Sequence, residues 1–165
     1  MSCKIDKQTA CLEWLAANGV GYDLVEHEAV FTIDEMDKLD LGARGIIVKN
    51  LFLRDDKGKR HFLVCERFDK RADLRALGET LGVKLSFASP ERLQKFLGLE
   101  KGAVTPLGLM NDKGAAVEVL LDADLDCGER LGVHPCVNTA SAFISYTDLV
   151  RLIEGNGNSL TGIKL

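Results

Sequence analysis

Two apolar segments separated by a short polar turn constrain the fold of this chain most. Residues 45–55 (GIIVKNLFLRD) and 60–66 (RHFLVCE) are rich in β-branched and aromatic side chains, which favour strands. The DKGK sequence between them supplies a glycine and polar residues, which are typical of a tight turn. The sequence therefore predicts a β-hairpin.

Helices are expected between further strands. Apolar residues at helical spacing, capping residues and terminal glycines predict helices over residues 6–19, 70–82, 89–98 and 145–155, and a capping box predicts a short one starting at Thr32. Other strands are expected at 21–28, on both sides of a turn at 111–114, and at 159–165 as an edge strand. Because strands and helices mix without strict alternation, we expect an α+β fold around a mostly antiparallel or mixed sheet.

Length and composition indicate an ordinary globular domain. With 165 residues, 46% hydrophobic and 28% charged, and with no linker or repeat, the chain is expected to form one domain over residues 1–165. The sequence has no run of eighteen apolar residues and no basic-then-apolar start, so we expect no membrane span, no signal peptide and a cytoplasmic location.

Charge is unevenly distributed along the chain. The net charge of −4 argues against broad, non-specific binding of nucleic acid. Residues 49–75 nevertheless hold nine Lys/Arg against five Asp/Glu, a local balance of 9 − 5 = +4. This segment is either a solvated hairpin face or a patch that contacts phosphates.

Several common reactive sites are absent from the sequence. The five cysteines are widely spaced without a CxxC pair, so we interpret them as buried packing thiols, with Cys65 and Cys136 as the candidates for a nucleophile otherwise. His, Asp, Glu and Cys show no metal-ligand spacing, and the sequence has no nucleophile elbow, GxGxxG or phosphate-loop motif.

Three segments place polar or rigid residues within apolar surroundings. Lys49 lies inside IIVKNLFL, where it is either an edge lysine that discourages strand pairing or a lysine that meets an anion. The turn GAVTP (102–106) either is an ordinary turn or directs several backbone N–H groups toward an anion or a carbonyl oxygen. His134 precedes a proline, Pro135, which fits poorly in a paired strand. His27 and His61 are interpreted as structural.

Four motifs together resemble those of the stand-alone prolyl-tRNA editing proteins, relatives of the editing domain inserted in bacterial prolyl-tRNA synthetase. They are VFTIDE (30–35), VKNLFLRD (48–55), KGAVTPLGL (101–109) and HPCVN (134–138), and the similarity runs over essentially the whole chain. One departure is Glu28, since EHEAV replaces the EHPAV common in the family; we expect it to change only the loop before the short helix.

The resemblance implies a fold and a reaction. The fold is a mixed, barrel-like sheet of about six or seven strands surrounded by helices, with a small pocket at one side. The reaction is hydrolysis of an aminoacyl ester at the acceptor end of a mischarged tRNA, foremost alanine on proline tRNA, without a metal or other cofactor. Editing of cysteine, serine or threonine, or a non-catalytic tRNA-binding module of the same fold, are the alternatives. Prolyl-tRNA synthetase is a candidate partner; DNA and membranes are not.

The resemblance also implies residue roles. Lys49 would meet the terminal phosphate or the aminoacyl end, Asn50 would orient the substrate, and His134 would act either as a base or as an anchor. Asn138 would support the histidine loop through hydrogen bonds. Further substrate-binding residues are Phe31, Thr32, Gly102, Ala103, Val104, Thr105 and Pro106. The segments around the lysine, the turn and the histidine are expected to converge on one cleft that admits alanine and excludes proline.

Overall fold

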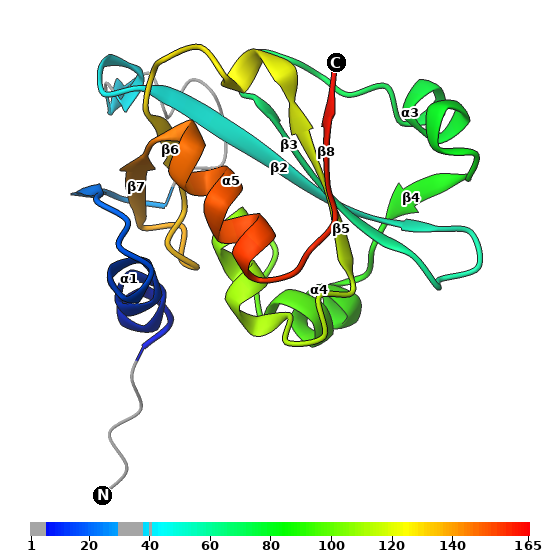
Figure 1. The fold of residues 1–165 in the computed structure, drawn as a ribbon, viewed down its shortest axis with the longest axis horizontal. Coiled ribbons are helices and arrows are strands. Elements are labelled where there is room, and N and C mark those ends of the chain that lie inside the picture. The colour runs from blue at the N-terminus through cyan, green and yellow to red at the C-terminus, as the bar shows by residue number, and fades with distance from the viewer. Residues whose placement is uncertain (1–5, 30–37, 40) are drawn as a thin grey trace, which may run out of the picture.

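A mixed sheet forms the centre of the protein, and helices cover it (Figure 1). The computed structural model describes residues 6–29, 38, 39 and 41–165. Its strands are β1 (Asp23–Glu26), β2 (Ile46–Asp55), β3 (His61–Arg67), β4 (Leu85–Phe87), β5 (Val117–Asp122), β6 (Leu131–Val133), β7 (Ala140–Ile144) and β8 (Leu160–Ile163). Its helices are α1 (Lys7–Ala17), α3 (Leu74–Leu81), α4 (Pro90–Leu97) and α5 (Tyr146–Gly155), with short 3-10 helices η1 (Leu41–Ala43), η2 (Pro106–Asn111) and η3 (Ala123–Leu125).

The strand order is β1-β7-β6-β2-β3-β5-β8, and β4 also pairs with β2. The hairpin of β2 and β3 is antiparallel, whereas β2 pairs with β6, β3 with β5 and β5 with β8 in parallel. The predicted α+β fold with a mixed sheet is therefore confirmed. Within the described residues the sheet has eight strands rather than six or seven, and its end strands β1 and β8 do not pair with each other. β8 lies at one edge, as expected.

The helices begin where the sequence predicts them because their first turns carry the expected capping groups. The carboxylate of Asp6 accepts a hydrogen bond from the Thr9 N–H at 2.7 Å and begins α1, and Ser89 begins α4 in the same way. The predicted helix starting at Thr32 lies outside the described residues. None of the helices in the described part of the chain combines the length and apolar character needed to cross a membrane.

One predicted strand is wrong. The segment before the turn at 111–114 forms the 3-10 helix η2 instead of a strand. Thr105 caps this helix by accepting from the Leu107 N–H at 3.3 Å, and Pro106 occupies its first turn. Because proline fixes a helix-compatible φ and cannot donate to a ladder, the segment turns rather than extends. The strand predicted after the turn is present as β5.

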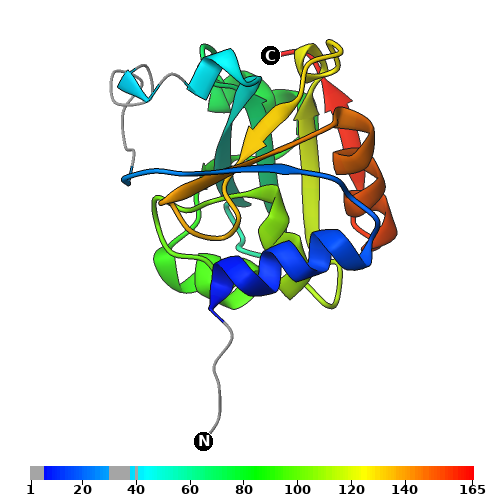
Figure 2. The same cartoon turned by 90° about the vertical axis from the view of Figure 1, so that its left-hand side faces the viewer.

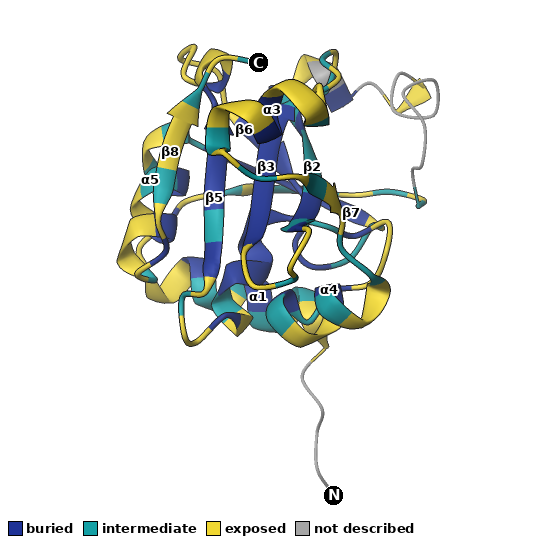
Figure 3. Cartoon of the chain, turned by 90° about the vertical axis from the view of Figure 1, so that its right-hand side faces the viewer, coloured by how far each residue is buried: buried dark blue, intermediate teal, exposed yellow. Residues whose placement is uncertain are grey.

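The sheet has a large core on one face and a smaller one on the other. The large core packs β-strand residues such as Val48, Phe52 and Leu63 against α1, α4 and α5. The smaller core packs Leu53 and its neighbours against α3. Figure 3 shows β3 buried along most of its length, and Figure 2 shows α1 across one end of the molecule with α5 at its side. Alternate residues of β2 and β3 thus face different cores.

One side of β2 is left without a neighbouring strand over its middle. β6 pairs with residues 46–47 of β2, and β4 pairs with residues 53–55. Backbone groups of even-numbered residues point to this side, since the Ile46 N–H donates to the Arg130 carbonyl at 2.8 Å and the Phe52 carbonyl accepts from the Ala88 N–H at 3.0 Å. Between these two pairings, the middle of β2 has no strand partner on this side.

Candidate active site

A small cavity lies where β1, β2, β6 and β7 meet. Among the described residues it is lined by His27, Leu41, Ile47, Val48, Gly132, His134 and Ser141. Its volume is about 20 Å³. That is enough room for a water molecule. Its walls are apolar except for two imidazoles and one hydroxyl.

His134 enters this cavity from the turn between β6 and β7. The predicted interruption of the strand at Pro135 is present: β6 ends at Val133, and Cys136 takes a left-handed φ of 63°. The Nδ1 atom of His134 lies 3.0 Å from the Ala140 carbonyl, which can only accept, so Nδ1 carries the proton. Burial lowers the pKa of His134, more strongly than the hydrogen bond to Ala140 raises it, and the nearby His27 also lowers it. The ring is therefore held neutral.

His27 is the functional candidate that the sequence interpretation missed. Its ring centroid lies 6.5 Å from that of His134, and both rings line the cavity. The Nδ1 atom of His27 lies 2.6 Å from the Glu28 carbonyl, and Nε2 lies 2.9 Å from the hydroxyl of Ser141. The available signal was strand alternation, because residues 25 and 27 share one face and Val25 faces Ser141 in the sheet.

Gly132 keeps the cavity open at its base. A Cβ atom at this position would lie 2.8 Å from Cε1 of Phe143 and 2.9 Å from Cδ1 of Ile47. Both distances are shorter than normal carbon contacts, so any side chain here would press on the wall of the cavity. The position on β6 between Ile47 of β2 and Phe143 of β7 thus requires a glycine.

Lys49 does not line the described cavity. It lies on the face of β2 opposite Val48, directly across from Glu66 of β3. Its Nζ lies 3.2 Å from Oε1 of Glu66, whose side chain is fully buried, whereas 38% of the lysine side chain is exposed. β2 is not an end strand of the sheet, although its middle, where Lys49 lies, has a strand neighbour on one side alone. Lys49 instead meets a protein anion.

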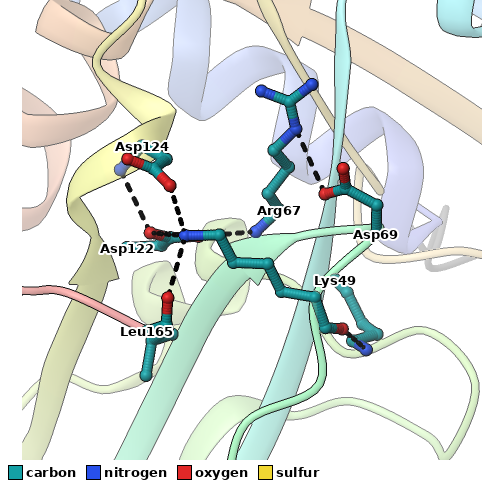
Figure 4. Close-up of polar contacts among 7 residues, drawn as sticks. Lys49, Arg67, Asp69, Asp122, Asp124 and Leu165 are labelled. Atoms are coloured by element: carbon teal, nitrogen blue, oxygen red, sulfur yellow. Dashed lines mark hydrogen bonds and ion pairs between the residues drawn. The ribbon is translucent and has the colours of Figure 1, made fainter.

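A second polar cluster fixes the backbone beside Lys49 (Figure 4). Nζ of Lys49 donates to the carbonyl of Lys70, and Nζ of Lys70 contacts Asp122 at 2.8 Å and Asp124 at 2.5 Å. Asp122 also accepts from the Arg67 N–H at 3.1 Å. Burial alone would raise the pKa of Asp122, but the bond from Lys70 and the backbone N–H groups outweigh it and lower that pKa. The carboxylate therefore stays charged and holds Lys70.

Asn50 connects β2 to the turn at 102–106. It faces the large core with Val48, and its Nδ2 donates to the Val104 carbonyl at 3.1 Å. None of the residues of this turn lines the described cavity. Ala103, Thr105 and Pro106 are buried, and the Ala103 N–H donates to the Glu100 carbonyl, so this N–H is not presented to a ligand.

Two further groups of predicted site residues have no described contact with the cavity. Among the described residues, no hydrogen bond involves the side chain of Asn138, so the expected support of the histidine loop by this residue is not found. The loop is held instead by the bond from His134 to Ala140. Phe31 and Thr32 lie outside the described residues.

The remaining histidine and three of the cysteines pack in the core, whereas Cys127 is exposed, so the prediction of a buried thiol is wrong at that position. Cys3 lies outside the described residues. His61 is buried and its ring lies 4.0 Å from that of Phe96, which is the structural role expected for it. Cys11, Cys65 and Cys136 are buried and free. Burial raises the pKa of Cys65, and a hydrogen bond with Cys136 raises that of Cys11 and lowers that of Cys136. The described part of the chain contains no cluster of three or more His, Cys, Asp or Glu suited to a metal ion.

Ion pairs reduce the charge of the basic segment 49–75. Arg60 pairs with Glu118, and Lys70 pairs with Asp122 and Asp124, acids that lie outside the segment. The segment is also long: β2 extends from the cavity at Val48 to Asp55, about 23 Å at roughly 3.3 Å per residue. Most of β2 therefore lies away from the cavity.

Comparison with known proteins identifies the family. The model of the aminoacyl-tRNA editing domain matches residues 27–152. The chain is 45% identical to the prolyl-tRNA editing protein ProX of Acetoanaerobium sticklandii, over 98% of this chain and 99% of that protein. It is 36% identical to the prolyl-tRNA synthetase associated domain-containing protein 1 of Mus musculus, over 87% and 88% of the two chains.

A solved structure described as a candidate trans-editing enzyme for prolyl tRNA synthetase has the same fold. It superposes with a TM-score of 0.75 at 23% identity and covers 99% of both chains. The resemblance seen in the four sequence motifs is thus confirmed, and the chain belongs to the family of aminoacyl-tRNA editing domains.

Proposed function

We propose that this protein is an editing hydrolase that removes alanine from mischarged proline tRNA. The family and the relative named as a prolyl-tRNA editing protein support hydrolysis of an aminoacyl-tRNA. One observation carries the proposal: His134 points a neutral imidazole into a small cavity that has room for water. This hydrolysis of mischarged tRNA would take place in the cytoplasm.

His134 would act as the general base. Because its Nδ1 proton is bonded to the Ala140 carbonyl, Nε2 carries a lone pair that can take a proton from an attacking water. An aminoacyl ester is already activated, so a positioned water and donors for the oxyanion are sufficient, and no covalent intermediate is needed. The packed cysteines would have no part in the reaction.

Selectivity for alanine would come from the size of the cavity. A synthetase site built for proline rejects a smaller amino acid poorly, since a missing methylene changes binding by only about 1–3 kcal/mol. Here Val48, Ile47 and Leu41 form apolar walls of the cavity. The space around Gly132 is too small even for one additional carbon atom. A methyl side chain would fit more easily than a pyrrolidine ring.

Lys49, Asn50 and the turn at 102–106 would hold the acceptor end around the cavity. The exposed part of the Lys49 side chain could exchange Glu66 for a phosphate of the tRNA. Asn50 would orient the terminal nucleotide through the turn that it already contacts. Because ion pairs further reduce the modest positive charge of the segment 49–75, we expect weak and salt-sensitive tRNA binding.

A panel of mischarged tRNAs tests the proposal. Wild-type protein should deacylate alanyl-tRNA(Pro) faster than the cysteinyl, seryl and threonyl forms, and His134→Ala should lower that rate at least a hundredfold. His61→Gln, a change of a histidine outside the cavity, should retain it. No hydrolysis of any substrate would leave a tRNA-binding module, and preference for another amino acid would change the assigned substrate. Added prolyl-tRNA synthetase shows whether it is a partner.

A further inference from the structure

Glu66 is a buried acid that depends on one flexible partner. Its side chain is fully buried on β3, and neither carboxylate oxygen accepts a hydrogen bond among the described residues. In the part of the chain that the structure describes, Lys49 is the one cation within ion-pair distance, with its Nζ 3.2 Å from Oε1 of Glu66. A charged carboxylate in the interior is unfavourable unless an opposite charge or hydrogen bonds offset its desolvation. The ammonium of Lys49 provides that charge.

Asp122, the other fully buried acid beside this pair, has different surroundings. Its carboxylate accepts hydrogen bonds from two backbone N–H groups, at 3.0 and 3.1 Å, in addition to the contact with Nζ of Lys70. Fixed backbone groups thus satisfy Asp122, as is usual for a buried polar group. Glu66 has no such alternative. Withdrawing Lys49 from it is therefore costly, and Glu66 competes strongly with any other anion for the lysine.

Lys49 is also the residue that would meet the tRNA. About a third of its side chain is exposed (38%), and it directly follows Val48, which lines the cavity. A tRNA phosphate has to displace Glu66 to bind this ammonium. We propose that Glu66 is a specificity-determining residue that competes with tRNA phosphate for Lys49, so that Lys49 is released only to a tRNA whose aminoacyl group occupies the cavity. The inference rests on the proposed function and names what controls one contact of that site.

The competition depends on how well the phosphate is held in place. An aminoacyl group bound in the cavity keeps the phosphates of the same acceptor end close to β2, which raises their effective concentration at Lys49. A tRNA without an aminoacyl group lacks this anchor, and Glu66, which is part of the same chain, keeps the ammonium. After hydrolysis the anchor is lost and Glu66 recovers Lys49. The arrangement thus favours binding of the mischarged substrate and release of the uncharged product.

The salt dependence of binding tests whether Lys49 contacts a phosphate, because each such contact adds about 0.7 to 0.9 to the slope of log Kd against log salt concentration. The probes are uncharged tRNA(Pro) and its 3′-alanylamido form, in which an amide replaces the hydrolysable ester. Wild type should show the larger slope for the alanylamido form. In Glu66→Gln, which frees Lys49, the slope for uncharged tRNA(Pro) should rise by about one contact and its affinity at least fivefold. The slope for the alanylamido form should stay unchanged.

Glu118→Gln is the matched control. It makes the same change in net charge and frees Arg60 from an ion pair at 2.8 Å, at the turn end of the β2–β3 hairpin. It should change the affinity for uncharged tRNA(Pro) less than twofold. If Glu66→Gln fails to fold, the double variant Lys49→Met/Glu66→Leu, which preserves the net charge, is used. It should bind the alanylamido form at least threefold more weakly and uncharged tRNA(Pro) within twofold of wild type.

Three results would overturn the inference. They are equal slopes of wild type for the two probes, an unchanged slope of Glu66→Gln for uncharged tRNA(Pro), and equal losses of the double variant on both probes. Hydrolysis of alanyl-tRNA(Pro) by wild type would keep the proposed function in each case. If wild type does not hydrolyse alanyl-tRNA(Pro), the proposed function is refuted, and the slopes for the two probes still decide whether Glu66 competes for Lys49.

Discussion

Replacing Lys49 by methionine tests how far this lysine stabilises the fold. If Lys49 served only to meet a ligand, its replacement would leave the stability near that of wild type. The structure changes this expectation. The side chain of Glu66 is fully buried, and neither of its carboxylate oxygens has a hydrogen bond among the described residues. The ammonium of Lys49 at 3.2 Å is its one described counter-charge.

The expected loss of folding stability follows from the least costly way to neutralise the unpaired carboxylate of Glu66. In Lys49→Met the glutamate can take up a proton, which at pH 7 costs about 1.36 kcal/mol for each unit above an ordinary carboxyl value near 4.3, or about 3.7 kcal/mol. Water that enters beside the half-exposed position 49 reduces this cost, so we expect a loss of about 2 to 3.7 kcal/mol, in line with other broken buried pairs. At pH 5 the same reasoning limits the loss to about 1 kcal/mol.

Urea denaturation at pH 7 and pH 5 measures both values. In the variant, a carboxyl that is buried in its neutral form favours folding at low pH. The loss of folding stability must therefore increase as the pH rises above 4.3. The double variant Lys49→Met/Glu66→Leu removes both charges and should lie within about 1.5 kcal/mol of wild type. A loss below about 0.5 kcal/mol at pH 7, independent of pH, would refute the reasoning.

Three further predictions concern the cavity and the thiols. If His134 is the base, the acid limb of kcat/KM should lie below the ordinary histidine pKa of 6.5, because burial lowers its pKa; a limb above 6.5 in a pH–rate profile would contradict this. Gly132→Ala should lower stability by about 1–3 kcal/mol through overpacking, seen as a lower Tm, and should slow deacylation. Cys65→Ser and Cys136→Ser should retain most activity in the deacylation assay, and abolished activity with intact folding would indicate a thiol nucleophile.

Sequence reasoning succeeded where local signals are strong. The β2–β3 hairpin, the capped helices and the edge strand were predicted because turn residues, caps and apolar periodicity act within a few residues. It failed at residues 107–111, where a cap and a proline outweighed an apolar run that suggested a strand. It also classed His27 with His61 as structural, since a lone histidine gives no local sign of which other side chains it will meet.

The sequence by itself determined the α+β class, the family and most helices and strands, though not β4, β6 or β7, because these depend on local propensity and on motifs in a fixed order. Strand alternation even required Lys49 and Asn50 to face opposite sides of the sheet. Only the tertiary structure decided which face carries the cavity and which distant residues meet there. His27, His134 and Ser141 come together because β7 pairs with both β1 and β6, and such non-local pairing depends on the whole arrangement of strands rather than on any one segment.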